Sequence, residues 1–284
     1  MNTVTEASPR GVGVPPPSPP DTSGVPTRRA ALLGARVLCV VLALGVWQLL
    51  VVTGALPDAA IAAPWDIGRA LGSMFADGAL WPAIRDTATT WAIGLGLSLA
   101  AAVPVGLLLG ASGLLYRVSR FSIDFLRSIP PIALIPLVLL QYGATTRMAL
   151  VLVVFGSLWP VLLQSMYGMH QLDPNLRDMA RTYGIGRWHY VRFVVLPSAS
   201  PFVATGIRVA ATMSLLLAIA AQLIGGAPGL GAEMTTYEQG GDVPRMWAVV
   251  VVIGLLGILL NRGLLALERR TLRWHSAYRP AAAS

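Results

Sequence analysis

The chain has 284 residues, of which 55% are hydrophobic and 12% charged, and its mean hydropathy is +0.66. Soluble globular domains carry about 25% charged residues, so the composition excludes an ordinary soluble domain and indicates a membrane protein. The formal net charge is +8, and every basic residue is Arg because the sequence contains no Lys. A basic chain can bind nucleic acid, but these Arg residues gather at the ends of apolar runs, where they set membrane orientation. We therefore expect the lipid bilayer, and no nucleic acid, as a partner.

Residues 1–30 are expected to form a disordered cytoplasmic tail. They contain the run PPPSPP and too little apolar bulk to offset the entropy of ordering. Arg28 and Arg29 before an apolar run, with AAIAA near residue 61, also fit a secretion signal with a cleavage site. Later apolar runs would keep the chain in the membrane in either case, so we interpret the first run as an uncleaved anchor.

Six apolar runs come close to the roughly 20 residues that a helix needs to cross a bilayer. They cover about 31–53, 84–110, 122–142, 148–169, 201–224 and 246–266. The sequence therefore predicts an all-α polytopic membrane protein, with a transmembrane domain over 31–270 and a cytoplasmic tail over 271–284.

The third run is unusual because it contains Pro130, Pro131 and Pro136. Membrane helices tolerate Pro when neighbouring helices satisfy the freed carbonyls, so we expect this span to be kinked and packed in the bundle interior. Asp124 and Arg127 stand near one end of the run, where they are expected to reach the interface by snorkelling.

The distribution of Arg favours a cytoplasmic location for both termini. With that orientation only four Arg residues lie outside, namely Arg69, Arg85, Arg147 and Arg245. If the third run did not cross, the Arg-rich loop around 170–200 would move to the outer side. The positive-inside bias therefore supports six crossings.

The loop over 172–197 is predicted to form two short amphipathic helices joined by a glycine turn. Asp173 can cap a helix that starts with Pro174, and Gly184 suits a left-handed carboxy cap. One apolar stripe runs along the first helix through Leu176, Met179, Ala180 and Tyr183. A second short helix is expected over about 187–195, with Leu196-Pro197 stopping it before the fifth span. Such a knob suits docking to a soluble partner, although a loop that holds lipid phosphates is an alternative.

The loop resembles the "EAA" loop of permease subunits of binding-protein-dependent ABC importers. That pattern is Glu-Ala-Ala, three residues, Gly, nine residues, then Ile-x-Leu-Pro. The corresponding residues here are Asp178, Met179 and Ala180, then Gly184, then Val194, Val195, Leu196 and Pro197. The spacing matches in full, while Asp178 replaces Glu, Met179 replaces Ala and Val194 replaces Ile.

The resemblance covers roughly residues 55–275 and is closest to the nitrate, sulfonate and taurine branch of these permeases. The matching pieces are Leu56-Pro57, Ala63-Pro64, LRSIPPIALIPLVLLQYG at 126–143, ARTYG at 180–184, GIRVA at 206–210 and PGLG at 228–231. Many relatives have Glu where this chain has Gln222, so that residue is a candidate for the pathway.

The resemblance implies a type I ABC importer permease whose loop over 172–197 is the coupling helix. Two ATP-binding subunits would dock on a permease homodimer in the bacterial plasma membrane. An extracytoplasmic substrate-binding protein would deliver solute near 54–82 and 225–245. The implied solute is a sulfonate, nitrate, taurine or similar anion, with a pyrimidine-type vitamin precursor as the alternative.

Two other classes of protein fit less well. A membrane enzyme would need clustered His, Cys, Asp or Glu, and the three His residues are scattered without metal-ligand spacing; we expect no catalytic residue, metal or resident cofactor. A phosphate-binding P-loop needs Lys, so ATP would be bound by a partner subunit. A secondary transporter working without an ATPase would need ionisable residues inside its spans, and Arg208 is the main candidate. Arg208 could attract an anionic substrate or snorkel to lipid phosphates.

Overall fold

The structure is a computed structural model that describes residues 25–55, 57 and 60–271. Regular structure in these residues is helical, with no strand among them. The elements in chain order are α1 (Val25–Val52), α2 (Pro64–Ala76), α3 (Leu80–Ala111), α4 (Gly113–Arg127), η2 (Pro131–Leu134), α5 (Ile135–Tyr142), α6 (Thr146–His170), α7 (Pro174–Thr182), α8 (Arg187–Tyr190), η3 (Val191–Val195), α9 (Leu196–Gly225), α10 (Leu230–Gln239) and α11 (Val243–Thr271). Most of the predicted tails 1–30 and 271–284, and Leu56 of the Leu56-Pro57 match, lie outside the described residues.

Among the described residues, five stretches are long and apolar enough to cross a membrane, and a bent pair of helices makes a sixth if the pair is counted as one span. The five contain α1, α3, α6, α9 and α11, and the sixth joins α4 to residues 131–142 through a bend of 69°. The prediction of an all-α membrane protein with about six spans is confirmed. α1 is described from Val25, which lies inside the predicted tail.

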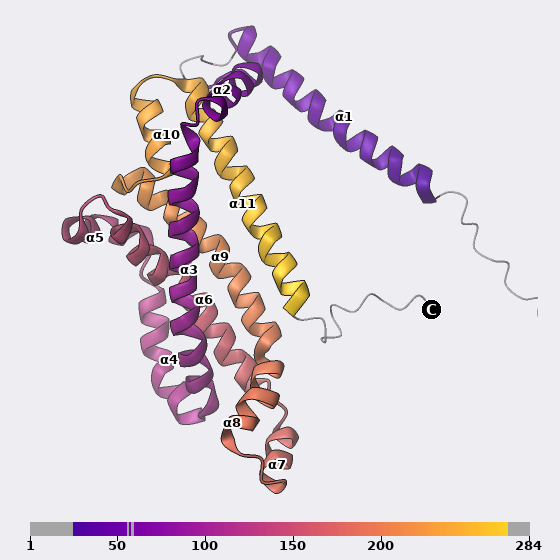
Figure 1. The fold of residues 1–284 in the computed structure, drawn as a ribbon, viewed down its shortest axis with the longest axis vertical. Helices are drawn as coiled ribbons and strands as arrows, with labels where there is room; N and C mark the ends of the chain where they lie inside the picture. The colour runs from indigo at the N-terminus through magenta and orange to yellow at the C-terminus, as the bar shows by residue number, and fades with distance from the viewer. Residues whose placement is uncertain (1–24, 56, 58–59, 272–284) are drawn as a thin grey trace, which may run out of the picture.

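The centre of the molecule is a close-packed bundle of α3, α6 and α9 (Figure 1). A Cβ placed on Gly106 of α3 would lie 2.6 Å from the Cβ of Ser165 on α6, so only glycine permits this approach. Further along the same interface the hydroxyls of Ser98 and Ser157 are hydrogen-bonded at 2.6 Å. Small residues and buried hydroxyl pairs therefore hold the bundle together, as expected for helices in lipid.

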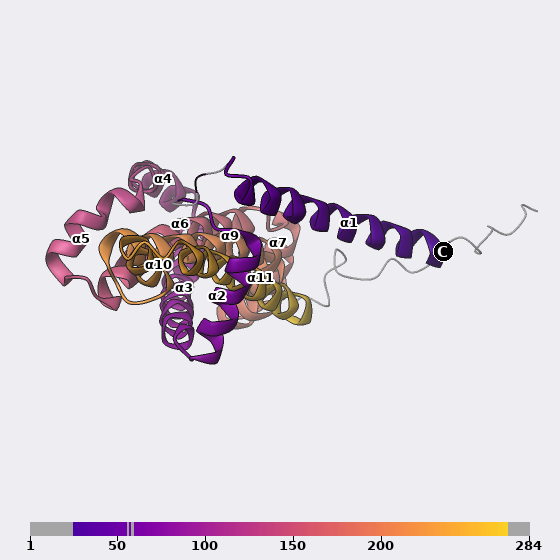
Figure 2. The ribbon, with the colours of Figure 1, turned by 90° about the horizontal axis from the view of Figure 1, so that it is seen from above.

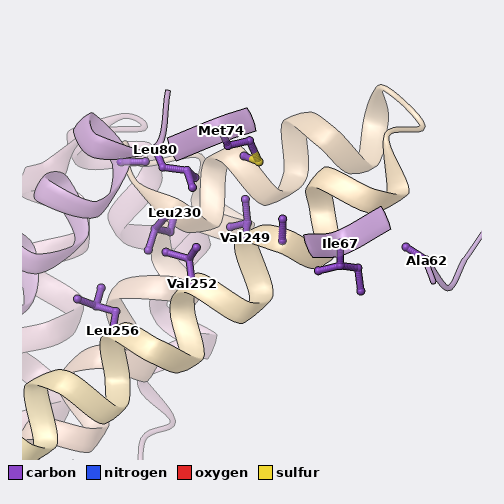
Figure 3. Close-up of a cluster of buried hydrophobic side chains, with 10 residues drawn as sticks. Ala62, Ile67, Met74, Leu80, Leu230, Val249, Val252 and Leu256 are labelled. Atoms are coloured by element: carbon purple, nitrogen blue, oxygen red, sulfur yellow. The ribbon is translucent and has the colours of Figure 1, made fainter. Parts of the chain in front are cut away.

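A separate apolar cluster closes the end of the bundle where α2 and α10 lie (Figure 3). Ile67 and Met74 of α2 and Leu230 of α10 are buried together with Val249 and Val252 of α11. This cluster fixes α2 and α10 against the outer ends of the long helices. α1 contacts the same end, where Trp47 meets Trp247 with ring centroids 5.8 Å apart, and then runs away from the bundle (Figures 1 and 2).

The third predicted span is kinked as expected, with a bend of 69°, but it differs from expectation in position. α4 already begins at Gly113, nine residues before the predicted start, because Ser112 caps its first turn by accepting from the Leu115 N–H at 3.4 Å. Pro130 and Pro131 then separate α4 from η2 and α5. Both views place α4 and α5 at the edge of the chain (Figures 1 and 2). The prediction of an interior position is therefore wrong for the single chain.

The predicted helix stop at Leu196-Pro197 is also wrong. α8 continues without a break through the π segment η3 into α9. Pro197 has no N–H to donate, and the backbone adapts by a wider turn in which the Leu196 N–H donates to the Val191 carbonyl five residues back.

Candidate functional site

The predicted coupling loop projects from one end of the molecule, opposite α2 and α10 (Figure 1). We define the knob as residues 173–195, which contain α7, α8 and η3. Its chain leaves α6 at His170 and re-enters the bundle at Leu196. The knob therefore lies beyond the apolar bundle, where another subunit can reach it.

The start of α7 follows the predicted capping pattern. The Asp173 carboxylate accepts a hydrogen bond of 2.9 Å from the Asn175 backbone N–H. Pro174 occupies the first helical position, where its missing N–H costs nothing. Both predicted roles are confirmed.

The end of α7 is fixed by Gly184, whose φ is +64°. The Ile185 N–H donates to the Ala180 carbonyl at 2.9 Å, and the Gly184 N–H donates to the Arg181 carbonyl at 3.1 Å. These two bonds form a Schellman motif, which requires a left-handed residue at the glycine position. The predicted glycine turn is therefore confirmed, and it sets the angle at which the chain enters α8.

The apolar stripe of α7 is mostly exposed. Ala180 is buried, but Met179 is 53% exposed and Tyr183 is 76% exposed. On the second half of the knob Trp188 is 70% exposed. Exposed apolar and aromatic side chains of this kind mark an interaction surface, and this one lies beyond the end of the bundle.

The remaining residues of the predicted coupling pattern lie on both sides of this surface. Asp178 is exposed beside Arg181, with carboxylate and guanidinium 4.0 Å apart. Val194 and Pro197 are half-buried where the knob joins α9, and Leu196 is exposed. The structure thus places part of the pattern on an exposed face and the rest where the knob connects to α9.

Arg208, a predicted pathway residue, forms an ion pair between α9 and α11. Its guanidinium donates to both carboxylate oxygens of Glu268, at 2.7 and 2.9 Å. Glu268 is buried and Arg208 is half-exposed. The positive charge of Arg208 is thereby matched by a carboxylate, so the pair serves to join the two helices. Sequence reasoning missed this partner because it lies 60 residues away in the chain.

Gln222, the other predicted pathway residue, is completely buried. Its side-chain oxygen accepts from the Thr87 hydroxyl at 3.0 Å and from the Gly231 N–H at 3.2 Å. The Thr87 oxygen in turn accepts from the Leu230 N–H at 2.9 Å. The PGLG turn is therefore held to α3 and α9 through this amide. Gln222 is therefore buried in the single chain, where it connects three segments, and its role in the pathway stays a prediction.

A groove of about 570 Å³ opens where α4 and α5 are separated. Its walls come from the break itself and from α6 and α9. They are formed by Arg127, Ser128, Pro130, Pro131, Ile132, Gly156, Trp159, Pro160, Leu163, Met213, Leu216 and Leu217. Arg127 and Ser128 are polar, and the other lining residues are apolar apart from the indole N–H of Trp159. The volume lies within the range of about 300–1,000 Å³ that small-molecule sites occupy.

Arg127 lies beside the middle of α6, where it shares the groove with Gly156 and Trp159, and not near the end of a span as predicted. The Tyr116 ring contacts the His170 ring at 4.4 Å, at the end of α6 nearest the knob. Arg127 lies eleven residues after Tyr116 on α4, and Trp159 lies eleven residues before His170 on α6. Eleven residues of helix span about 16 Å. Arg127 and Trp159 both line the groove, and so does Gly156 in the middle of α6.

Three charged side chains on α4 leave one positive charge uncompensated at this depth. Asp124 lies 3.0 Å from Arg127 and 3.7 Å from Arg120, so two cations share one carboxylate. The Arg127 side chain is 49% exposed. Sequence reasoning missed the groove because the depth of Arg127 depends on where the helix breaks. The charge of Arg127, three residues before the Pro130-Pro131 pair, is the signal that could have indicated it.

Comparison with known proteins gives a consistent assignment. The family of binding-protein-dependent transport system inner membrane components matches residues 102–273. The putative aliphatic sulfonates transport permease protein SsuC of Escherichia coli is 30% identical, over 82% of this chain and 89% of its own. The nitrate import permease protein NrtB of Leptolyngbya laminosa is 26% identical, over 77% of this chain and 80% of its own.

Among solved structures, the inward-facing MetNI methionine ABC transporter matches with a TM-score of 0.60. The match has 21% sequence identity and covers 67% of this chain and 95% of that chain. At this identity the likeness shows the fold, and it agrees with the predicted type I importer permease architecture. The family match covers more than half of the sequence and includes the knob, the groove and the Arg208–Glu268 pair. The chain therefore belongs to the family of inner membrane components of binding-protein-dependent ABC transport systems.

Proposed function

We propose that the chain is the permease subunit of an importer for a small oxyanion, in which two copies pair around the pathway. Each knob docks on one ATP-binding subunit, and a substrate-binding protein delivers solute at the α2–α10 end. The similarity to permeases named for aliphatic sulfonates and nitrate supports an anionic substrate. The family match supports an ABC importer permease over a secondary transporter that works without an ATPase.

The exposed knob is the single observation that carries the docking role. Met179, Tyr183 and Trp188 present apolar surface beyond the end of the bundle. Desolvation of aromatic and Met side chains at the centre of an interface contributes much of the binding energy between proteins. Because η3 joins the knob to α9 without a break, a displacement of the knob would move a helix at the centre of the bundle. Such a connection provides the state-dependent contact that coupling requires.

The chemistry of ATP hydrolysis belongs to the partner subunit in this proposal. The chain contains no Lys to contact the phosphates as a P-loop does, and we assign it no catalytic residue, cofactor or metal. The knob and both termini are assigned to the cytoplasmic side of the bacterial plasma membrane, which fits the predicted excess of Arg there. The relatives named for sulfonates and nitrate favour an oxyanion over a pyrimidine-type vitamin precursor.

Site-directed cross-linking tests the docking role directly. In a Cys39→Ser background, Met179→Cys on the knob and Trp81→Cys at the opposite end are each labelled with a photoactivatable cross-linker in the co-expressed transporter. Both positions are exposed, at 53% and 58% respectively. We expect the ATP-binding subunit to be cross-linked only from position 179. Cross-linking of that subunit from position 81, or its absence from position 179 in an assembled complex, would contradict the docking face.

A further inference from the structure

The groove at the α4–α5 break joins a charged side chain to apolar walls in the middle of the spans. Arg127 lines it together with Pro131 from the break and Leu216 and Leu217 from α9. A charged side chain at mid-depth in a bilayer is costly, and such residues almost always face the protein interior or a water-filled cavity. In the single chain half of the Arg127 side chain is exposed. The guanidinium therefore needs water, a second copy of the chain or a bound anion beside it.

The local charge balance selects among the ligands that could enter. Asp124 is shared by Arg120 and Arg127, so the α4 cluster carries one net positive charge. A cation would be repelled by this cluster, and a neutral solute would leave the charge unmatched. A guanidinium recognises carboxylate, sulfonate or similar oxyanions through paired hydrogen bonds. The apolar walls add affinity for a substituent on that anion and would contribute nothing to a bare inorganic ion.

We propose that this groove is the anion-selecting section of the pathway and takes a small organic oxyanion. The oxyanion head binds Arg127, and its apolar substituent packs on Pro131, Leu216 and Leu217. Arg127 is a substrate-binding residue in this assignment, while Asp124 positions its guanidinium through the 3.0 Å contact. The inference rests on the proposed permease function and adds to it the substrate class and the residue that recognises it.

Charge-selective labelling of a cysteine on the groove wall tests the assignment. Leu216, which is 60% exposed, is changed to Cys in the Cys39→Ser background of the co-expressed transporter. Two reagents are compared: anionic 2-sulfonatoethyl methanethiosulfonate, which is itself a small alkanesulfonate, and the cationic trimethylammonium analogue. The ratio of their rate constants reports the charge in the groove, because ionisation of the thiol affects both reactions equally.

We expect the anionic reagent to react faster, and Arg127→Gln to lower the anion-to-cation ratio by at least about tenfold. One unit charge within about 10 Å at an effective dielectric constant of about 20 is sufficient for such a change. Arg127→Lys should restore most of the preference. Arg120→Gln removes a charge two turns away on α4, outside the groove, and should lower the ratio by clearly less than Arg127→Gln does.

Three results would overturn the inference. They are equal reactivity towards both reagents in the parent, equal effects of the two Gln variants, and failure of both reagents to reach the cysteine at position 216. Leu255→Cys on α11, which is 57% exposed on another face, controls for labelling from the lipid and should react slowly. Co-purification of the ATP-binding subunit is scored separately in every variant. A failure of the proposed function therefore appears as loss of that subunit, and a failure of the groove assignment appears in the rate ratio.

Discussion

Substitution of Gly184 tests whether the shape of the knob controls docking. Gly184 holds φ at +64°, and a Cβ added there would meet no atom within 4 Å. The effect of a substitution is therefore backbone strain and not a steric clash. A left-handed conformation costs a non-glycine residue roughly 1–2 kcal/mol, with Asn and Asp tolerated best and β-branched residues worst.

If docking requires the Schellman turn, this strain lowers the affinity of the ATP-binding subunit. A cost of about 1–2 kcal/mol corresponds to a weakening of roughly 5- to 30-fold. We expect Gly184→Val to weaken binding most, Gly184→Ala less and Gly184→Asn least, with uptake falling in the same order. The assay is titration of the purified ATP-binding subunit onto permease in nanodiscs. Equal affinities for the Val and Asn variants would refute the argument that the left-handed turn sets the docking geometry.

Three further predictions concern residues outside the turn. Trp188→Ala should weaken binding of the ATP-binding subunit by about 2 kcal/mol or more. It should not lower the thermal stability of the purified permease, because Trp188 is 70% exposed. A loss of stability with unchanged binding would contradict this prediction. Thr87→Val should destabilise the chain by about 1–3 kcal/mol, because the Leu230 N–H loses its acceptor and the Gln222 side chain loses a donor. Denaturant unfolding measures the change in the free energy of unfolding. An unchanged free energy of unfolding would contradict the structural role of the hydroxyl. Arg208→Gln should cost about 1–3 kcal/mol because it removes the guanidinium that contacts buried Glu268 at 2.7 Å. Glu268→Gln should cost less because Arg208 is half-exposed. Additive effects in the double variant would exclude a functional pair.

Local signals made part of the site predictable. The caps of α7 depend on residues within a few positions of one another, so Asp173 and Gly184 could be assigned from spacing alone. The apolar runs likewise indicated the membrane spans, because length and hydropathy are properties of a continuous segment. The resemblance in the loop over 172–197 then indicated the family.

The other features of the site depend on contacts between residues far apart in the chain, which the sequence alone does not show. Gln222 is bonded to Thr87, 135 residues away, so its burial depends on how α3 meets α9. Pro197 suggested a helix stop, but the π segment before it absorbed the missing donor. The depth of Arg127 depends on the length of α4 and on its contact with α6 at Tyr116. The fold places Arg208 and Gln222 in contacts between helices, and it places Arg127 in a groove that sequence alone did not indicate.

The most direct test of the central claim is purification of the tagged chain from its native membrane in mild detergent, followed by mass spectrometry. We predict that an ATP-binding subunit accompanies the native chain in equal amount and is reduced several-fold with Gly184→Val, while the chain remains folded. A folded chain that carries no ATP-binding subunit would contradict its role as an ABC permease that docks through the knob.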